Sequence, residues 1–237
     1  MKITNKKAKV RKKIIQAAVE LMSDKGYQKV SMRMIAKAAE VGDATIYNYF
    51  TNKDKILVGY FEQVFDETLS EVEQIDEFEH FSLQEKVQCL LETNLTILLA
   101  HREFVEEAVE IAFMTPSLRS KAISGFRQKT IDTFSEYLDH AVQKDEIEPQ
   151  AGSGFIETLF WDYYLGVVIY WLKDDSEDFT QTTQLIDLST ALIVTVMESG
   201  VINRAGDMLT FLFRHHMFSG FDYMTRALTS VRKISRR

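Results

Sequence analysis

Side chains that bind metals, activate nucleophiles or cradle phosphates set what a chain can catalyse. The segment from Glu77 to His80 has the carboxylate–imidazole spacing of a metal site on a helix, but such sites need a second copy and further inward-facing glutamates. No second copy occurs, so an exposed acidic loop is the better interpretation. The single cysteine, Cys89, excludes an internal disulfide. Because no glycine-rich phosphate loop and no Ser/His/Asp set is found either, the sequence predicts no catalytic residue, no metal and no cofactor.

The charge of the chain is unevenly distributed. Its formal net charge is −7, which by itself argues against a nucleic-acid partner. Residues 1–60, however, hold 13 Lys/Arg and 5 Asp/Glu, a charge of +8, whereas residues 61–237 hold 15 and 30, a charge of −15. A small basic module joined to a large acidic one is expected when one end of a protein meets phosphate. A disordered basic tail is the alternative, and it accounts for residues 2–13 but not for the ordered apolar pattern that follows.

The elements that position these charges are predicted to be helices. Two prolines and ten glycines are few for this length and favour long helices over many short strands. The first helix is expected over residues 10–25, with Gly26 placed to end it. Ser31 can cap a short second helix, a third runs from near residue 42 to about residue 50, and Asn52 can cap a fourth. Later helices are predicted over residues 83–100, 102–114, 118–143, 155–173 and 179–199, with one or two more after Gly200.

Residues 14–57 resemble the DNA-binding region of the TetR family. The pieces IxxAAxELxxxKGY, SxRxIAxAA, TxYNYF and NKDxI keep that family's order and spacing. The apolar pattern is consistent with this, because Ile35, Val41 and Ile46 supply a small core while Ala36 and Ala39 let the third helix cross the second closely. One face of the third helix is then left for the major groove, as helix-turn-helix docking requires.

The resemblance implies roles for individual residues. Tyr47 and Lys53 would touch phosphates, Ser31 would hold a phosphate at the start of the second helix, and Arg33 would reach a base or the backbone. A hydroxyl, an amine at a helix N-terminus and a guanidinium suit these contacts. The other candidate DNA contacts, at the N-terminal part of the third helix, are Gly42, Asp43, Ala44, Thr45 and Asn48. The alternative for Tyr47 is a place in the core, and the alternative for Lys53 is a merely solvated side chain. Tyr49 and Phe50 are expected in the core.

Three positions depart from the family pattern. Glu40 stands where the family usually has glycine at the turn, and a non-glycine residue in a left-handed conformation costs about 1 kcal/mol. Gly42 replaces the usual capping serine, and Ala44 replaces the glycine that follows. Asp43 either caps the third helix or accepts a hydrogen bond from a cytosine amino group, and we favour capping. Thr45 can serve equally in packing or in reading a thymine methyl group.

The predicted helix over residues 155–173 is apolar almost all round, which indicates burial on more than one side. Its Trp161, Tyr164 and Trp171 are expected to spread around the helix, so that a partner chain would have to cover part of it. The resemblance implies a homodimer in which this helix and the one over 179–199 pair with their copies. The second helix carries Leu185, Leu188, Leu192 and Val196 along one side.

The resemblance also implies a small-molecule pocket in the larger part, and occupation of that pocket releases DNA. Sixteen phenylalanines and nine methionines suit an apolar or aromatic effector. Glu157 and Asp162 are acids within an apolar helix, where a cationic group would meet them. The candidate ligand-binding residues are Phe113, Phe160, Trp161, Asp162 and Tyr164. The alternative for each of them is ordinary core or helix surface.

Together these features predict an all-α protein in two parts. Residues 1–52 form a helix-turn-helix domain with a basic arm, and residues 53–237 form a ligand-binding and dimerisation domain. We expect a cytoplasmic, ligand-responsive regulator, most simply a repressor, that binds a palindromic double-stranded DNA operator as a homodimer and is released by a small-molecule effector. No membrane contact is expected, because the longest strongly apolar run, LGVVIYWL, is too short to span a bilayer. The competing hypothesis is a helical lipid or small-molecule carrier, or an enzyme, with a vestigial DNA-binding motif. The segment after Gly200 can extend the core, the dimer or the pocket.

Overall fold

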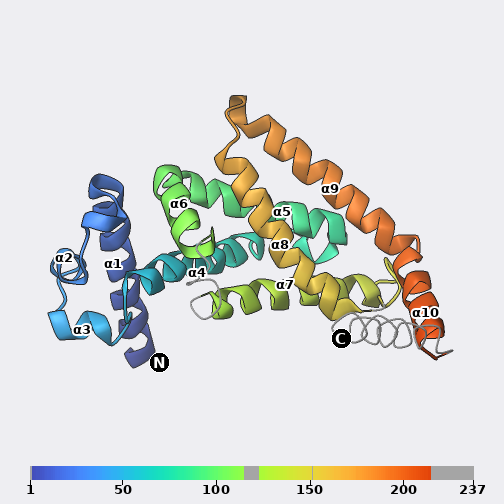
Figure 1. The fold of residues 1–237 in the computed structure, drawn as a ribbon, viewed down its shortest axis with the longest axis horizontal. Coiled ribbons are helices and arrows are strands. Elements are labelled where there is room, and N and C mark those ends of the chain that lie inside the picture. Colours follow the sequence, from blue (N-terminus) through green and yellow to red (C-terminus); the bar gives the residue numbers. More distant parts are fainter. Residues whose placement is uncertain (1, 115–122, 151, 215–237) are drawn as a thin grey trace, which may run out of the picture.

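A computed structural model describes residues 2–114, 123–150 and 152–214 (Figure 1). Within these ranges every regular element is helical, as predicted. The α-helices are α1 (Lys2–Lys25), α2 (Met32–Ala38), α3 (Asp43–Tyr47), α4 (Lys53–Val72), α5 (Leu83–Leu99), α6 (Arg102–Val109), α7 (Ser124–Gln143), α8 (Ser153–Leu172), α9 (Thr180–Glu198) and α10 (Val201–Arg214). Short helical turns lie at η1 (Tyr27–Lys29), η2 (Phe78–His80) and η4 (Glu177–Phe179), and η3 (Glu110–Met114) is a π-helix.

Two helix boundaries differ from the sequence prediction for a physical reason. The first helix begins at Lys2 rather than at residue 10, because lysine-rich turns have good helix propensity but no apolar period to reveal them. The helix predicted over 102–114 changes to π-helix at Glu110, a change of winding that side-chain periodicity does not encode. The start predicted for the seventh helix, at residue 118, lies outside the described residues, as does the tail after Arg214.

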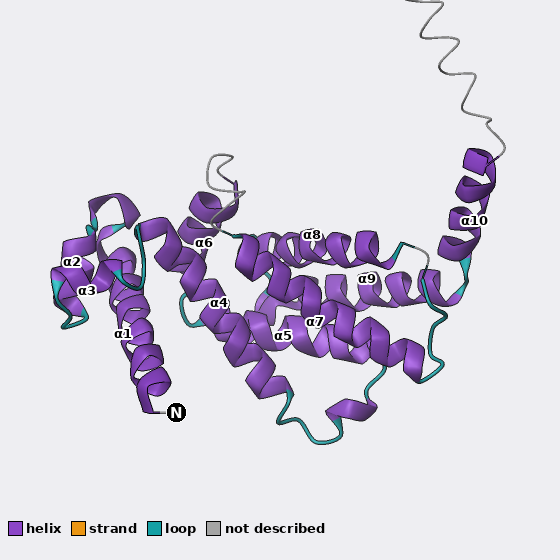
Figure 2. Ribbon diagram, turned by 90° about the horizontal axis from the view of Figure 1, so that it is seen from below, coloured by secondary structure: helices purple, strands orange, loops and turns teal. Residues whose placement is uncertain are grey.

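The helices α1, α2 and α3 form a small lobe at one end of the molecule, and α4 leads from it into the larger part (Figures 1 and 2). Buried side chains of α1, Ile14 and Ala18, share its core with Ile35 and Ile46. Phe50 packs so closely on α4 that a Cβ at Gly59 would lie 2.7 Å from its ring. The helix-turn-helix is therefore seated directly on α1 and the first turns of α4.

The buried face of α8 corrects one expectation from the sequence. Trp161, Tyr164 and Trp171 are all buried within a single chain, with 3%, 2% and 2% of their surfaces exposed. Steps of three and ten residues keep them within about 80° of one another around the helix. The inference that they cannot all enter one core was therefore wrong. The apolar side chains of α8 that do face outward are Phe155, Leu159 and Tyr170.

The last long helix, α9, packs against α5 and α8 and leaves one apolar side uncovered. Ile186 and Val194 are buried, whereas Leu188 and Leu192 are 65% and 64% exposed. With Val196, Phe155 and Leu159 they make an outward apolar surface on α8 and α9, which we call the α8–α9 face. The structure thus keeps an uncovered surface where the sequence placed the dimer, although on other residues of α8.

Within the described residues, no single helix is long and apolar enough to cross a membrane. The bent pair Glu177–Glu198 and Val201–Met208 reaches that length and apolarity only when the two helices are taken together. No three His, Cys, Asp or Glu side chains within the described ranges are grouped as metal ligands.

Candidate nucleic-acid interface and effector site

The start of α2 and the turn after it are organised by local backbone chemistry. The Ser31 hydroxyl accepts a hydrogen bond from the Met34 amide at 3.2 Å, which confirms Ser31 as the N-cap of α2. At the turn, Glu40 has φ 55°, the left-handed conformation that a glycine would adopt without cost. The Val41 amide then donates to the Ala36 carbonyl at 2.9 Å. These bonds set the angle at which α3 leaves α2.

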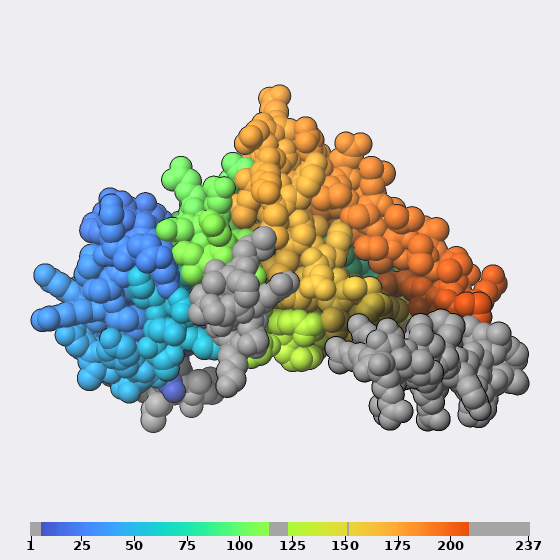
Figure 3. Space-filling model, viewed as in Figure 1, coloured from blue at the N-terminus to red at the C-terminus, as the bar shows by residue number. Residues whose placement is uncertain are grey.

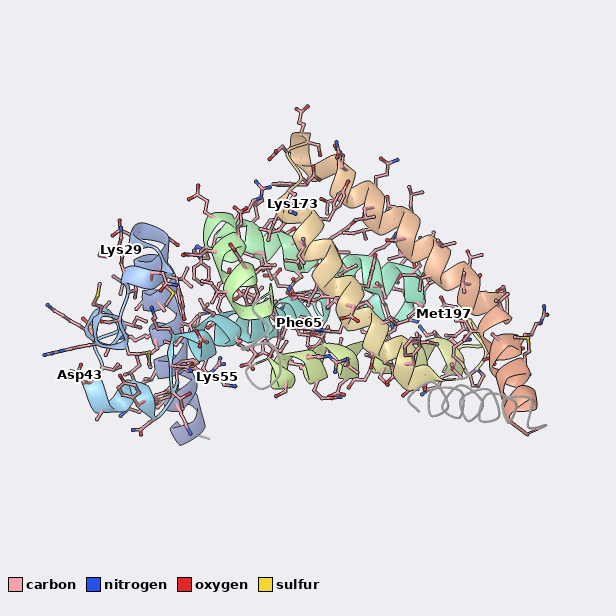
Figure 4. The ribbon with its side chains drawn as sticks, viewed as in Figure 1. Lys29, Asp43, Lys55, Phe65, Lys173 and Met197 are labelled. Carbon is pink, nitrogen blue, oxygen red and sulfur yellow. The ribbon has the colours of Figure 1, made fainter. Side chains whose placement is uncertain are left out.

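The predicted DNA contacts lie largely on the surface of this lobe. Tyr47 is 55% exposed, Thr45 and Lys53 are half-buried, and Phe50 is buried, as expected for a core residue. Figures 3 and 4 show the lobe at one end of the elongated molecule, with Asp43 at its outer side. The remaining candidates are all exposed: Ser31, Arg33, Gly42, Asp43, Ala44 and Asn48.

The carboxylate of Asp43 does not cap α3, which corrects the favoured interpretation. Gly42 is the N-cap, and no side chain caps this helix. Asp43 is instead the first helical residue, and its Oδ2 lies 3.3 Å from Nε of Arg33. Both side chains are well exposed, so this ion pair contributes little stability. It nevertheless holds two candidate DNA contacts side by side, one from α2 and one from α3.

The half-buried side chain of Lys53 contacts Tyr27 of the same chain. Its Nζ donates to the Tyr27 carbonyl at 2.7 Å and lies 4.0 Å from the centroid of the Tyr27 ring. Desolvation in this position lowers the pKa of Lys53. Because these contacts occupy only part of an ammonium group with three donors, its role as a phosphate ligand stays a prediction.

Tyr27 joins the lobe of α1, α2 and α3 to the larger part. Its amide donates to both carboxylate oxygens of Glu107 on α6, at 3.1 Å each, and its hydroxyl contacts the carboxylate of Asp54. Burial, followed by that hydrogen bond, raises the pKa of Tyr27. Lys53, Tyr27 and Glu107 therefore form one linked set, which we call the Tyr27 link, running from the start of α4 through η1 to α6.

Three of the predicted ligand residues meet in the core of the larger part. Phe113 and Trp161 have ring centroids 6.0 Å apart, and Trp161 and Tyr164 lie 6.1 Å apart. Phe126 of α7 packs edge-on against Trp161 at 5.3 Å. Phe65 of α4 also packs against these rings, and Figure 4 shows it where α8 crosses α4 in this view. We call this set the aromatic cluster: Phe61, Phe65, Phe113, Phe126, Trp161 and Tyr164.

A buried polar string borders the aromatic cluster. The Tyr164 hydroxyl donates to Asn94 Oδ1 at 3.0 Å, and Asn94 Nδ2 donates to the Thr68 hydroxyl at 2.9 Å. The nearby Tyr60 hydroxyl is buried and has no hydrogen-bond partner among the described residues. Burial raises the pKa of both tyrosines, with a further contribution at Tyr164 from Tyr60. An unsatisfied buried hydroxyl costs about 1–3 kcal/mol, so a ligand that forms a hydrogen bond with the Tyr60 hydroxyl would be favoured.

The other two predicted ligand residues lie elsewhere. Phe160 stacks on Phe134 with ring centroids 4.0 Å apart and lines an apolar groove of about 360 Å³ between α7, α8, α9 and α10. That groove includes Leu159 and Leu192 of the α8–α9 face. Asp162 is exposed and belongs to neither place. The five predicted ligand residues thus do not form a single site.

Several residues of these sites were missed by sequence reasoning. Asn94 could have been found, because it occupies an apolar register of α5, four residues after Leu90 and four before Leu98. The contact between Tyr27 and Glu107 could not, since it joins residues 80 positions apart, although Tyr27 itself ends the piece IxxAAxELxxxKGY.

Comparison with known proteins agrees with the fold and with the N-terminal motif. Residues 14–59 match the family model described as bacterial regulatory proteins, tetR family. Residues 86–212 match the one described as tetracyclin repressor-like, C-terminal domain, which alone covers more than half of the chain. These matches account for both parts of the molecule.

Individual relatives carry regulator names. The fatty acid metabolism regulator protein of Bacillus subtilis (strain 168) is 26% identical over 192 residues, which cover 81% of this chain and 95% of that protein. A putative TetR-family regulator from Syntrophomonas wolfei has a similar fold, with a TM-score of 0.62 at 18% identity over 80% of this chain and 96% of its own. The regulator FadR from Bacillus subtilis, solved in complex with stearoyl-CoA, has a TM-score of 0.54 at 21% identity, covering 79% and 97%. The chain described here belongs to the TetR family of bacterial transcriptional regulators.

Proposed function

We propose that this ligand-responsive regulator is a repressor that binds a palindromic operator as a homodimer and leaves it when a long-chain fatty acyl thioester binds. The observation that carries the proposal is the physical continuity between the aromatic cluster and the DNA-binding lobe. Phe113 belongs to the π-helix η3, which continues α6, and α6 carries Glu107 to Tyr27. One short path therefore leads from a buried apolar site to Lys53.

The class of effector is argued from the chemistry of the core. The aromatic cluster offers a large apolar surface, and the Tyr60 hydroxyl and the polar string offer hydrogen bonds at its border. An apolar site with a few placed polar groups suits a ligand with a long hydrocarbon chain and a single polar linkage. A relative is named for fatty acid metabolism, and a structural neighbour was solved with stearoyl-CoA. Both support an acyl thioester here.

The release of DNA follows from the packing. The rings of the aromatic cluster already fill its interior, so an acyl chain that inserts between Phe113 and Trp161 has to move η3. Because η3 continues α6, the shift withdraws Glu107 from the Tyr27 amide. The lobe then loses the orientation that matches operator DNA. An effector that binds the two states unequally in this way shifts their populations.

The homodimer is argued from the α8–α9 face. Leu188, Leu192 and Phe155 are each more than 60% exposed on adjacent helices. Contiguous exposed apolar surface of this kind marks an association site, and a twofold dimer suits a palindromic operator because the symmetry of the protein mirrors that of the DNA. We propose recognition helices about 34 Å apart, one helical turn of B-DNA.

The test begins with selection of bound duplexes from genomic DNA, followed by titration of the recovered operator. Stearoyl-CoA should lower the affinity at least tenfold, whereas coenzyme A alone should leave it unchanged. Specific binding that ignores stearoyl-CoA would overturn the effector class. Failure to bind any duplex with steep salt dependence would overturn the operator function and favour the carrier hypothesis.

A further inference from the structure

The N-terminal half of α1 carries an unusual run of charge. The helix begins at Lys2, whereas the match to the family model begins at residue 14. The first acidic residue in the chain is Glu20, so residues 1–19 contain only positive charge. A helix that is merely solvated usually alternates charges of both signs along its face. The charge of this segment therefore suits a partner that carries negative charge along an extended length.

Three of these lysines share one side of the helix. Lys6, Lys9 and Lys13 are separated by three and four residues, which keeps them within about 60° of one another. All three are exposed. We call this set the basic stripe. Lys7 and Lys25, also exposed, lie on α1 at about 100° or more from every residue of the stripe and fall outside it.

The contacts of α1 show which way the basic stripe faces. Lys13 Nζ lies 3.6 Å from a carboxylate oxygen of Glu40, the residue at the turn between α2 and α3. Arg11 points to the other side, where it pairs with Glu62 of α4 at 2.6 Å and lies over the Phe50 ring. The stripe thus continues the side of the lobe that carries the helix-turn-helix. Figure 2 shows the N-terminal half of α1 projecting beyond α2 and α3.

We infer that the basic stripe is a second DNA contact, which binds backbone phosphates that flank the half-site read by α3. The inference rests on the proposed operator function. Twelve helical residues before residue 14 extend about 18 Å, roughly half a turn of B-DNA. Lysine ammonium groups act as point charges that neutralise phosphates without reading bases. The stripe therefore adds affinity and salt dependence but no sequence preference.

The test compares two double variants of the full chain on the selected operator with long flanks. Lys6→Gln with Lys9→Gln removes four stripe charges per dimer. If all four neutralise phosphates, the slope of log K against log salt should fall by about 3.6, with sequence preference unchanged. Lys7→Gln with Lys25→Gln removes the same charge from the same helix outside the stripe and should change the slope much less. Glutamine has nearly the helix propensity of lysine, so both variants keep α1.

Duplex length supplies the second measurement. On an operator trimmed to its palindrome, wild type and the stripe variant should have equal slopes, because the flanking phosphates are gone. The inference is overturned if the two double variants lower the slope equally, or if trimming does not remove the difference. Those results leave specific operator binding intact, whereas loss of the proposed function would show as no specific binding by the wild-type chain.

Discussion

At the scale of single residues, Glu40 combines a backbone cost with a position that we propose to lie close to operator DNA. Its φ of 55° costs about 1 kcal/mol for any residue with a Cβ. We expect Glu40→Gly to raise the free energy of unfolding by about that amount, measured by urea titration, whereas Glu40→Ala keeps the Cβ and should not. Both variants remove a carboxylate near phosphate and should bind operator more tightly. Equal stability of the two variants would show that backbone strain is not the cause.

The candidate DNA contacts should separate into two kinds. Tyr47 is assigned to phosphate, so Tyr47→Phe should weaken binding to all duplexes by a similar factor. Asn48, the C-cap residue of α3, is assigned to base contact, so Asn48→Ala should change which base pairs are preferred, by about 1–3 kcal/mol at the contacted position. Binding to a library of operator variants measures both effects. A change of preference in the Tyr47 variant would reverse the assigned roles.

Local rules predicted some of these residues and not others. The cap at Ser31 follows from chemistry within four residues, and the left-handed Glu40 follows from the resemblance, which has glycine at that turn. Asp43 was misjudged because the guanidinium of Arg33, ten residues earlier, competes for its carboxylate. The resemblance covers both Lys53 and Tyr27 but does not imply the contact between them, which joins residues 26 positions apart.

At the scale of elements, we propose α6 as the connection between effector and DNA. Glu107→Gln keeps one acceptor for the Tyr27 amide but removes its charge, and a charge-assisted hydrogen bond contributes about 1.5–3 kcal/mol. We expect weaker operator binding without effector and a smaller response to stearoyl-CoA, both measured by anisotropy. Glu106→Gln alters an exposed neighbour on the same helix and should change neither quantity. Unchanged behaviour of the Glu107 variant would exclude the Tyr27 link as the connection.

Helix content and order were predictable because apolar periods of 3.6 residues repeat along most of the chain. The period fails where a helix is polar on all sides, as in the first turns of α1, and where winding changes, as in η3. The prediction for Trp161, Tyr164 and Trp171 was wrong because their spacing along the sequence was taken to mean that they point to different sides of α8. Steps of three and ten residues in fact keep them within about 80° of one another around the helix. Contacts between distant helices, which build the aromatic cluster and the Tyr27 link, leave no local signal.

At the scale of the whole molecule, the α8–α9 face should hold the dimer together. Leu192 is 64% exposed in the single chain, so Leu192→Glu should not disturb the fold but should place charges inside the interface. We expect a monomer by sedimentation and loss of operator binding. Leu99→Glu, at another exposed leucine outside this face, should remain dimeric. A dimeric Leu192 variant that binds operator normally would place the interface elsewhere, most simply at the helix after Gly200.

We propose that one effector site and one operator surface are coupled, and such coupling is reciprocal by thermodynamic necessity. The direct measurement is the Kd of stearoyl-CoA for the full chain, with and without saturating operator duplex. We expect operator to weaken stearoyl-CoA binding by the same factor by which stearoyl-CoA weakens operator binding, and a scrambled duplex to have no such effect. Binding of stearoyl-CoA that is equally tight with and without operator would contradict the account.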